Sequence, residues 1–309
     1  MKITEKSGFL KDIYNNKVLY LMFMPAALWF LLFSYIPMGG IIVAFKQFDY
    51  KGGILFSAWN GIENFKYFFV SGKALSVTLN TINYNLIFLA CYTLFSLMTA
   101  IMIDVMLGKW YKKLIQSFMF LPYFISWVVV SSFVYNFFNY EYGTLNVMLK
   151  AFGGQPVDIY SFPVYWQYIL PMLYVWKWAG FGSVLYLAAI AGIDQECFEA
   201  SIIDGANLFQ KIFKITIPML KPTIIILVLL GIGRIMRGEF DMFYNLIGNN
   251  GILMDKTDIV DTFVFRSLVG TQDFGMASAS GLYQSVLCFI IIIVTNKIAK
   301  SIDREYALF

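Results

Sequence analysis

The stretch EASIIDGA, residues 199–206, is polar and lies between two long apolar segments of the chain. Asp204-Gly205 divides it, because glycine adopts a positive φ angle at little cost and can end one short helix before another begins. Apolar side chains recur at intervals of four, three and four residues, which predicts one shared helical face: Ile202, Ala206, Phe209 and Phe213. The sequence therefore predicts a shaped loop between two membrane spans.

The composition requires lipid around most of the chain. Of its 309 residues, 59% are hydrophobic and 14% are charged, and the mean hydropathy is +0.68. A helix needs about 20 apolar residues to cross the hydrocarbon core of a bilayer. Windows of that kind occur six times, so we expect an all-α polytopic membrane protein with spans at 18–45, 78–105, 114–138, 165–191, 219–241 and 276–298.

The distribution of lysine and arginine predicts the orientation. With six spans both termini lie on one side, and 13 of the 23 basic residues fall in the termini and in the second and fourth connections. Positive charge is enriched in cytoplasmic segments, which places both termini and the loop at 192–218 inside the cell. We expect a cytoplasmic segment at 1–17, a transmembrane domain at 18–298 and a cytoplasmic tail at 299–309.

Several function classes are excluded by the residue types present. The chain has no histidine, and Cys91, Cys197 and Cys288 are widely separated, so we expect neither a metal site nor a disulfide framework. Gly72-Lys73 and Gly108-Lys109 lack the earlier glycine and the following Ser or Thr of a phosphate loop. The basic residues form no dense cluster, which argues against nucleic-acid binding. We therefore expect no catalytic residue and no cofactor in this chain.

The loop at 199–218 resembles the EAA coupling loop of permease subunits in type I ATP-binding-cassette importers. It matches that pattern at Glu199, Ala200, Gly205 and Pro218, and it departs from it with Ser201 in place of the second alanine. The resemblance implies the type I permease fold and a loop helix seated in a cleft of a separate ATPase. The implied coupling residues are Glu199, Ala200, Ser201, Asp204, Gly205, Ala206, Phe209 and Pro218. Periodicity alone is equally typical of a connector lying on the membrane surface.

The fifth predicted span carries charged residues in its outer half. Arg234, Arg237 and Asp241 are spaced three and four apart, which predicts one face of a helix. Charges within a span normally face protein or water, so this face is expected to line a substrate path. An ion-paired interface with a second permease, or emergence of the helix into the outer aqueous phase, explains the same pattern. Lys177, flanked by two tryptophans in the fourth span, is expected to extend to the outer interface.

Polar and aromatic residues in the spans suit a sugar, whose hydroxyls need hydrogen bonds and whose ring faces stack on aromatic side chains. The same residue types also make helix contacts and interfacial belts in any membrane protein. The residues expected to line the substrate path are Asn83, Tyr84, Trp127, Tyr135, Arg234, Arg237, Glu239, Asp241, Tyr244, Tyr283 and Gln284.

Four further stretches are similar to the carbohydrate-permease branch, and within it to the LplB-like group associated with complex oligosaccharides. They are residues 188–194, 240–245, 261–266 and 281–285. Met242 departs from the pattern, because a glutamine that is able to bond a sugar hydroxyl is common at that position.

The resemblance implies a multi-pass protein of the cell membrane that imports an oligosaccharide by alternating access. The implied partners are a second homologous permease, two copies of an ATPase that binds ATP and Mg, and an extracytoplasmic solute-binding lipoprotein. An importer of peptides, amino acids or polyols is the alternative within this class. A stand-alone secondary transporter or channel is the alternative outside it, and it predicts ion-coupling groups buried in the spans.

Overall fold

The computed structural model describes residues 13–302 and consists mainly of helices. Five helices are long and apolar enough to cross a membrane: Lys17–Phe45, Lys73–Val105, Pro163–Ala191, Leu208–Gly233 and Phe274–Ser301. A bent pair of shorter helices, counted as one crossing, gives the sixth span. The all-α polytopic fold is thereby confirmed. Residues 1–12 and 303–309 of the predicted cytoplasmic ends lie outside the described residues, and the orientation stays a prediction.

The first part of the chain forms two spans joined by a small antiparallel ribbon, in which Lys46 pairs with Trp59. Its elements are α2 (Lys17–Phe30), η1 (Leu31–Tyr35), α3 (Ile36–Met38), η2 (Gly39–Phe45), β1 (Lys46–Gln47), α4 (Gly53–Phe56), β2 (Ala58–Trp59), α5 (Glu63–Val70) and α6 (Lys73–Val105). The middle part contains α7 (Lys109–Phe120), η3 (Leu121–Phe124), α8 (Trp127–Phe138), α9 (Thr144–Ala151), η4 (Ile159–Ser161) and α10 (Pro163–Ala191).

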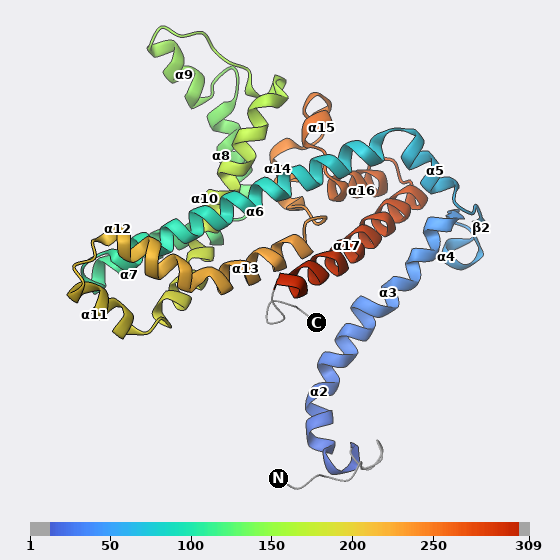
Figure 1. The fold of residues 1–309 in the computed structure, drawn as a ribbon. Helices are drawn as coiled ribbons and strands as arrows, with labels where there is room; N and C mark the ends of the chain where they lie inside the picture. Colours follow the sequence, from blue (N-terminus) through green and yellow to red (C-terminus); the bar gives the residue numbers. More distant parts are fainter. Residues whose placement is uncertain (1–12, 303–309) are drawn as a thin grey trace.

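The last part of the chain contains two spans and the short helices around them. Its elements are α11 (Gln195–Ile203), α12 (Leu208–Lys211), the π-helical turn η5 (Ile212–Thr216), α13 (Ile217–Gly233), α14 (Phe240–Ile247), α15 (Gly251–Thr257), α16 (Val260–Val269) and α17 (Phe274–Ile302). α11 and α12 lie at the opposite end of the bundle from α5 and α15 (Figure 1).

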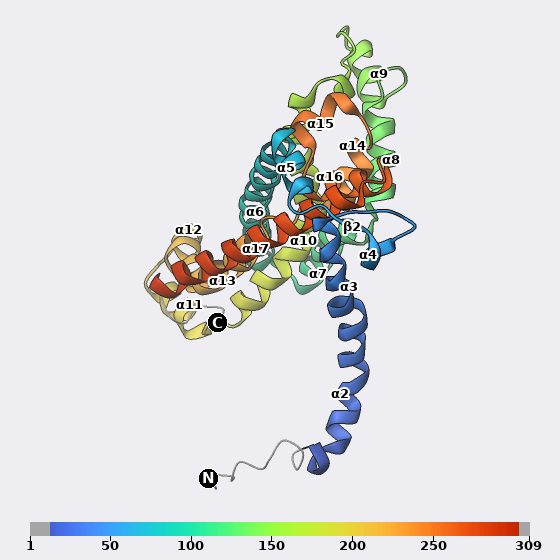
Figure 2. The ribbon, with the colours of Figure 1, turned by 90° about the vertical axis from the view of Figure 1, so that its right-hand side faces the viewer.

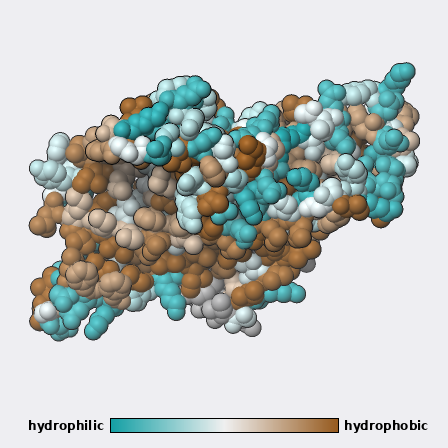
Figure 3. All heavy atoms as spheres, turned by 90° about the horizontal axis from the view of Figure 1, so that it is seen from above, coloured by the Kyte–Doolittle hydropathy of each residue, from teal (hydrophilic) through white to brown (hydrophobic). Residues whose placement is uncertain are grey.

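The bundle is built on α6 and α10, which pack against each other, with α13 and α17 alongside (Figure 1). The first span extends away from this bundle (Figures 1 and 2), and none of the residues of α2 is buried. An apolar helix with no buried face is stable only when lipid is its solvent. Figure 3 shows one face of the molecule, on which apolar residues form a continuous belt and polar residues gather beside it and at the ends.

The third span is broken, in contrast to the straight helix predicted at 114–138. Its two halves, Lys109–Phe124 and Trp127–Phe138, are bent by 92°. Pro122 removes a backbone donor at the break, and Ser126 restarts the helix by accepting a hydrogen bond from the Val129 amide at 3.4 Å.

Lys177 satisfies the backbone of this break. Its Nζ donates to the carbonyl oxygens of Pro122 at 3.3 Å, Tyr123 at 3.2 Å and Ile125. The side chain is 5% exposed and lies over the ring of Trp127. The prediction that Lys177 extends to the outer interface was therefore wrong, because the carbonyl groups at the break bind its ammonium group inside the bundle.

The fifth span also differs from the prediction of 219–241. It begins at Leu208, where Asn207 and Gln210 form a reciprocal capping box with bonds of 2.9 and 2.8 Å, and it ends at Gly233. The chain then turns, with the Arg234 amide donating to Gly231 at 3.0 Å. Arg234 and Arg237 therefore lie in a loop and Asp241 in α14, so the predicted helical face that these three residues share does not exist.

Candidate functional site

Residues 234–239, called the central loop, connect α13 to α14 inside the bundle. Their backbone is held by side chains from other helices. The amide of Asn85 on α6 donates to the Ile235 carbonyl at 2.8 Å, and the amide of Gln284 on α17 donates to the Met236 carbonyl at 2.6 Å. Irregular backbone inside a membrane protein needs such partners, because lipid offers none.

A carboxylate of α16 completes the support of the central loop. Asp261 accepts hydrogen bonds from the Gly238 amide at 2.9 Å and from Gln284 Nε2 at 3.1 Å. A Cβ atom on Gly238 would lie 2.3 Å from Cδ1 of the fully buried Ile259, so a side chain at this position requires Ile259 to move. The central loop is thus fixed by contacts that come from α6, α16 and α17 together.

The central loop borders a cavity of about 700 Å³, called the central cavity. This size lies within the roughly 300–1,000 Å³ range of small-molecule sites. Five aromatic residues of α6 and α10 form one wall: Phe88, Tyr92, Tyr174, Trp178 and Phe181. Four charged residues line the cavity as well: Arg234, Arg237, Glu239 and Asp261. The cavity therefore combines flat apolar rings with groups that are able to bind charge.

The pKa values of the two carboxyl groups in the central cavity are shifted by their surroundings. Burial raises the pKa of the Glu239 carboxyl, and a hydrogen bond from Trp127 together with the charge of Arg234 opposes this rise. Burial also raises the pKa of the Asp261 carboxyl, against the effect of the hydrogen bonds from Gly238 and Gln284.

Four of the residues predicted to line the substrate path come together in the central cavity: Arg234, Arg237, Glu239 and Gln284. The structure places the others elsewhere. Tyr84 and Trp127 belong to a buried core cluster, although Trp127 reaches Glu239. Tyr135 lines a separate pocket of about 460 Å³ beside Tyr160.

The remaining predicted path residues pack locally or face outward. Tyr244 stacks on Phe240 at 5.3 Å, and the Tyr283 hydroxyl lies 3.0 Å from Thr78 Oγ1. Asn83 and Asp241 are exposed outside the cavity lining. Met242, which replaces a common glutamine, is fully buried in the core. The substitution at that position therefore does not alter the surface of the cavity.

Sequence reasoning missed the aromatic wall. Phe88 and Tyr92 are four residues apart, and Tyr174, Trp178 and Phe181 are spaced four and three apart. These intervals place each set on one helical face, which is a signal that the sequence contained. This spacing did not distinguish the cavity, because aromatic residues are frequent along all the spans.

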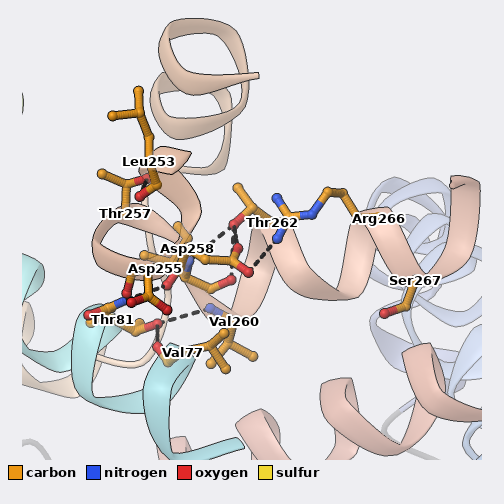
Figure 4. Close-up of polar contacts among 12 residues, drawn as sticks. Val77, Thr81, Leu253, Asp255, Thr257, Asp258, Val260, Thr262, Arg266 and Ser267 are labelled. Carbon is orange, nitrogen blue, oxygen red and sulfur yellow. Dashed lines mark hydrogen bonds and ion pairs between the residues drawn. The ribbon is translucent and has the colours of Figure 1, made fainter. Parts of the chain in front are cut away.

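A polar network attaches α15 and α16 to α6 (Figure 4). Thr81 on α6 accepts a hydrogen bond from the Val260 amide at 3.0 Å and donates to the Val77 carbonyl at 2.6 Å. Asp258 forms an ion pair with Arg266 and accepts a hydrogen bond from Thr262 at 2.6 Å. The network fixes the start of α16, which carries Asp261 toward the central loop.

The predicted coupling residues extend from α11 to the start of α13. Those in α11 are Glu199, Ala200 and Ser201, those in the turn after it are Asp204, Gly205 and Ala206, and Phe209 and Pro218 lie in α12 and α13. Asp194 caps α11 by accepting from the Glu196 amide at 3.1 Å, and Gly205 has a φ of +71°. Ile203 is 87% exposed and Phe209 is 70% exposed, whereas Ser201 is buried and bonds the Phe198 carbonyl. The turn at Gly205 separates two helices, so the predicted single face through Ile202, Ala206, Phe209 and Phe213 does not form. The contact with an ATPase stays a prediction.

Comparison with known proteins gives the family. Residues 93–304 match the model of the binding-protein-dependent transport system inner membrane component. The chain belongs to this family. It is a multi-pass transport subunit of the cell membrane, as the spans and the resemblance predicted.

Relatives align with almost the whole chain. The protein LplB of Bacillus subtilis is 33% identical over 96% of this chain and 93% of its own length. The polygalacturonan/rhamnogalacturonan transport system permease protein YteP of the same organism is 28% identical over 98% of this chain and 94% of its own. Among solved structures, a chain of a bacterial ABC transporter for the acidic polysaccharide alginate is 31% identical, with a TM-score of 0.86 over 95% of this chain and 99% of that one. The predicted carbohydrate branch is thus confirmed at the level of relatives.

Proposed function

We propose that this chain is one of two permease subunits of an ATP-binding-cassette importer and that its cargo is an oligosaccharide. In this proposal, the partners are a second, related permease, two copies of a cytoplasmic ATPase that binds ATP and magnesium, and an extracytoplasmic solute-binding lipoprotein. The central cavity opens to the two sides of the membrane in turn as ATP is bound and hydrolysed. The subunit itself makes or breaks no covalent bond.

The exposed loop at residues 192–218, called the coupling loop, is the observation on which the importer assignment rests. Ile203 and Phe209 are large apolar side chains that face outward from a loop with charged neighbours. Exposed apolar residues rimmed by polar ones are typical of a protein–protein contact. An ATPase gripping this loop would move α10 and α13, since the two helices leave the loop at either end. A secondary transporter or channel needs no contact surface for an ATPase.

The central cavity and the relatives support the saccharide cargo. Sugar rings stack on aromatic side chains, and the half-buried Tyr174, Trp178 and Phe181 of the aromatic wall provide such surfaces. Relatives are named for arabinooligosaccharide, trehalose/maltose and polygalacturonan/rhamnogalacturonan transport. Another relative is named for the uptake of osmoprotective compounds. The alternative that the cargo is a polyol is therefore included in the binding test below.

The test of the coupling role is Gly205→Asp in the complete importer reconstituted in liposomes. A residue with a side chain is strained at a φ of +71°, and the added carboxylate alters the surface that the ATPase is proposed to grip. We expect the permease to remain in the membrane and ATP-driven uptake to be abolished.

Gly192→Asp is the matched control, because it adds the same charge to the same connection at a φ of −84°. Uptake by this control is expected to stay near the wild-type rate. Full uptake by Gly205→Asp would contradict the coupling role.

The cargo is tested separately with the purified solute-binding partner. Binding of oligosaccharides, polyols and peptides is measured in parallel by calorimetry. We expect binding among the oligosaccharides. A peptide ligand together with failure of every glycan would overturn the cargo and leave the importer assignment standing.

A further inference from the structure

The central cavity is lined by two guanidinium groups that form no ion pair with the residues that the structure describes. Arg234 and Arg237 line the cavity and are exposed to it. Within residues 13–302, neither has a carboxylate oxygen within 4 Å. Arg266 differs, because it is paired with Asp258 in the network of α16. The charge of Arg266 therefore serves the fold, whereas the charges of Arg234 and Arg237 remain available.

The carboxylates nearest to these arginines are engaged by other donors. Asp261 accepts hydrogen bonds from the Gly238 amide and from Gln284, so its carboxylate is bound to the central loop and to α17. Glu239 accepts from Trp127. Each carboxylate is thus bonded by a donor other than a guanidinium group, whereas the two arginines are exposed at the cavity. Their N–H donors are therefore available to an anion in the cavity.

The aromatic wall of the cavity suits a sugar ring. Tyr174 lines the cavity and is held in place by stacking on the buried Phe88, with centroids 4.4 Å apart and an interplanar angle of 9°. The half-buried rings of Tyr92, Trp178 and Phe181 line the same cavity and add further apolar surface.

We propose that the central cavity selects oligosaccharides that carry carboxylate groups. Arg234 and Arg237 bind the carboxylates through paired N–H donors, and the aromatic wall receives the ring faces. A neutral sugar of the same shape leaves the two guanidinium groups desolvated and unpaired, so it is disfavoured. The inference rests on the proposed function, because it names the class of cargo for the same cavity.

An ion-paired interface with the second permease is the competing explanation for the two arginines. It predicts that their removal weakens assembly of the permease pair and lowers the transport of acidic and neutral cargo equally. The proposed selectivity predicts intact assembly and a change in the ratio between acidic and neutral cargo. The two explanations therefore differ in a measurable ratio.

The experiment uses the complete importer in liposomes. The probes are short oligomers of galacturonate, glucuronate and mannuronate, each compared with its own methyl ester, which removes the charge and keeps the sugar. Uptake driven by ATP is measured for the wild type, for the double variant Arg234→Gln and Arg237→Gln, and for Lys256→Gln. Lys256 is an exposed lysine of α15 outside the cavity, so it controls for loss of a positive charge.

We expect ATP-driven uptake by the wild type to be about tenfold or more faster for at least one acidic oligomer than for its ester, because one charge-assisted hydrogen bond is sufficient for a difference of this size. The double variant should lose this preference while keeping the permease pair intact on size-exclusion chromatography, and Lys256→Gln should keep it. Equal uptake of every acid and its ester by the wild type would overturn the inference and leave the importer standing. So would loss of the permease pair in the double variant. Absence of any ATP-driven saccharide uptake by the wild type would instead overturn the proposed function.

Discussion

The coupling loop and the central loop both connect helices, yet they are stabilised in different ways. In the coupling loop, Asp194 caps the amide two residues ahead, and Asn207 and Gln210 cap each other across three residues. In the central loop, Asn85 bonds a carbonyl 150 positions away and Gln284 bonds one 48 positions away. The coupling loop is thus encoded locally, whereas the central loop exists only when α6, α16 and α17 are assembled around it.

The two loops therefore differ in whether a substitution affects mainly function or mainly stability. A loop held by its own neighbours, with its apolar side chains exposed, contributes to function through what it contacts and little to stability. A loop held by buried amides from distant helices contributes to the stability of the whole bundle, since each lost donor leaves an acceptor unsatisfied. Three predictions test this difference, in order of decreasing effect on stability.

The largest loss of stability is expected for Gln284→Leu. Leucine has nearly the same volume, but the Met236 carbonyl loses its side-chain donor, and the Asp261 carboxylate keeps the Gly238 amide and loses the Gln284 amide. Each unsatisfied buried acceptor costs about 1–3 kcal/mol of the free energy of unfolding. The measurement is unfolding by SDS titration in mixed micelles. Ser285→Ala is the control, since this neighbouring hydroxyl bonds only within its own helix; an equal loss in both variants would contradict the supporting role of Gln284.

An intermediate effect is expected when glycine is replaced by alanine in each loop. Gly238→Ala places a Cβ atom 2.3 Å from Ile259 Cδ1, and overpacking of this kind costs about 1–3 kcal/mol. Gly205→Ala meets no atom within 4 Å and is destabilised only by its φ of +71°, by about 1 kcal/mol. The same titration compares the two variants. A larger loss at Gly205 than at Gly238 would break the distinction between the loops.

The smallest effect on stability is expected for Ile203→Ser in the coupling loop. Because this side chain is 87% exposed, the free energy of unfolding should change by less than about 0.5 kcal/mol. Retention of the ATPase during purification of the importer should fall, since the apolar contact is lost. Val269→Ser at the end of α16 removes another exposed apolar side chain and should leave ATPase retention unchanged. Unchanged retention in Ile203→Ser would argue against a contact at this position.

Much of the fold followed from apolar run length. The spans at 18–45 and 276–298 agree closely with the structure, because a continuous run of about 20 apolar residues has few alternatives to a membrane helix. The break at Pro122 and the end of the fifth span at Gly233 were missed. Both depend on partners from other helices, namely Lys177 for the first and Asn85 with Gln284 for the second.

The candidate site divides in the same way. The arginines of the central loop were predicted from their unusual position in an apolar region, and the structure places both in the cavity. Tyr84 and Tyr283 were predicted from residue type alone, and both pack within the protein instead. Residue type shows what a side chain is able to bind, whereas the direction in which it points depends on helix rotation, and in a uniformly apolar helix no polar face reveals that rotation.

The lipid environment, the number of apolar segments and the two-helix shape of the coupling loop follow from the sequence alone, because each depends on residues that are close together in the chain. The end of the fifth span at Gly233 depends on the assembled bundle, and so does the cavity that Arg234 and Arg237 line together with aromatic rings of α6 and α10. The physical reason is that backbone groups released inside a membrane protein need hydrogen-bond partners, and here those partners come from helices far away in the sequence.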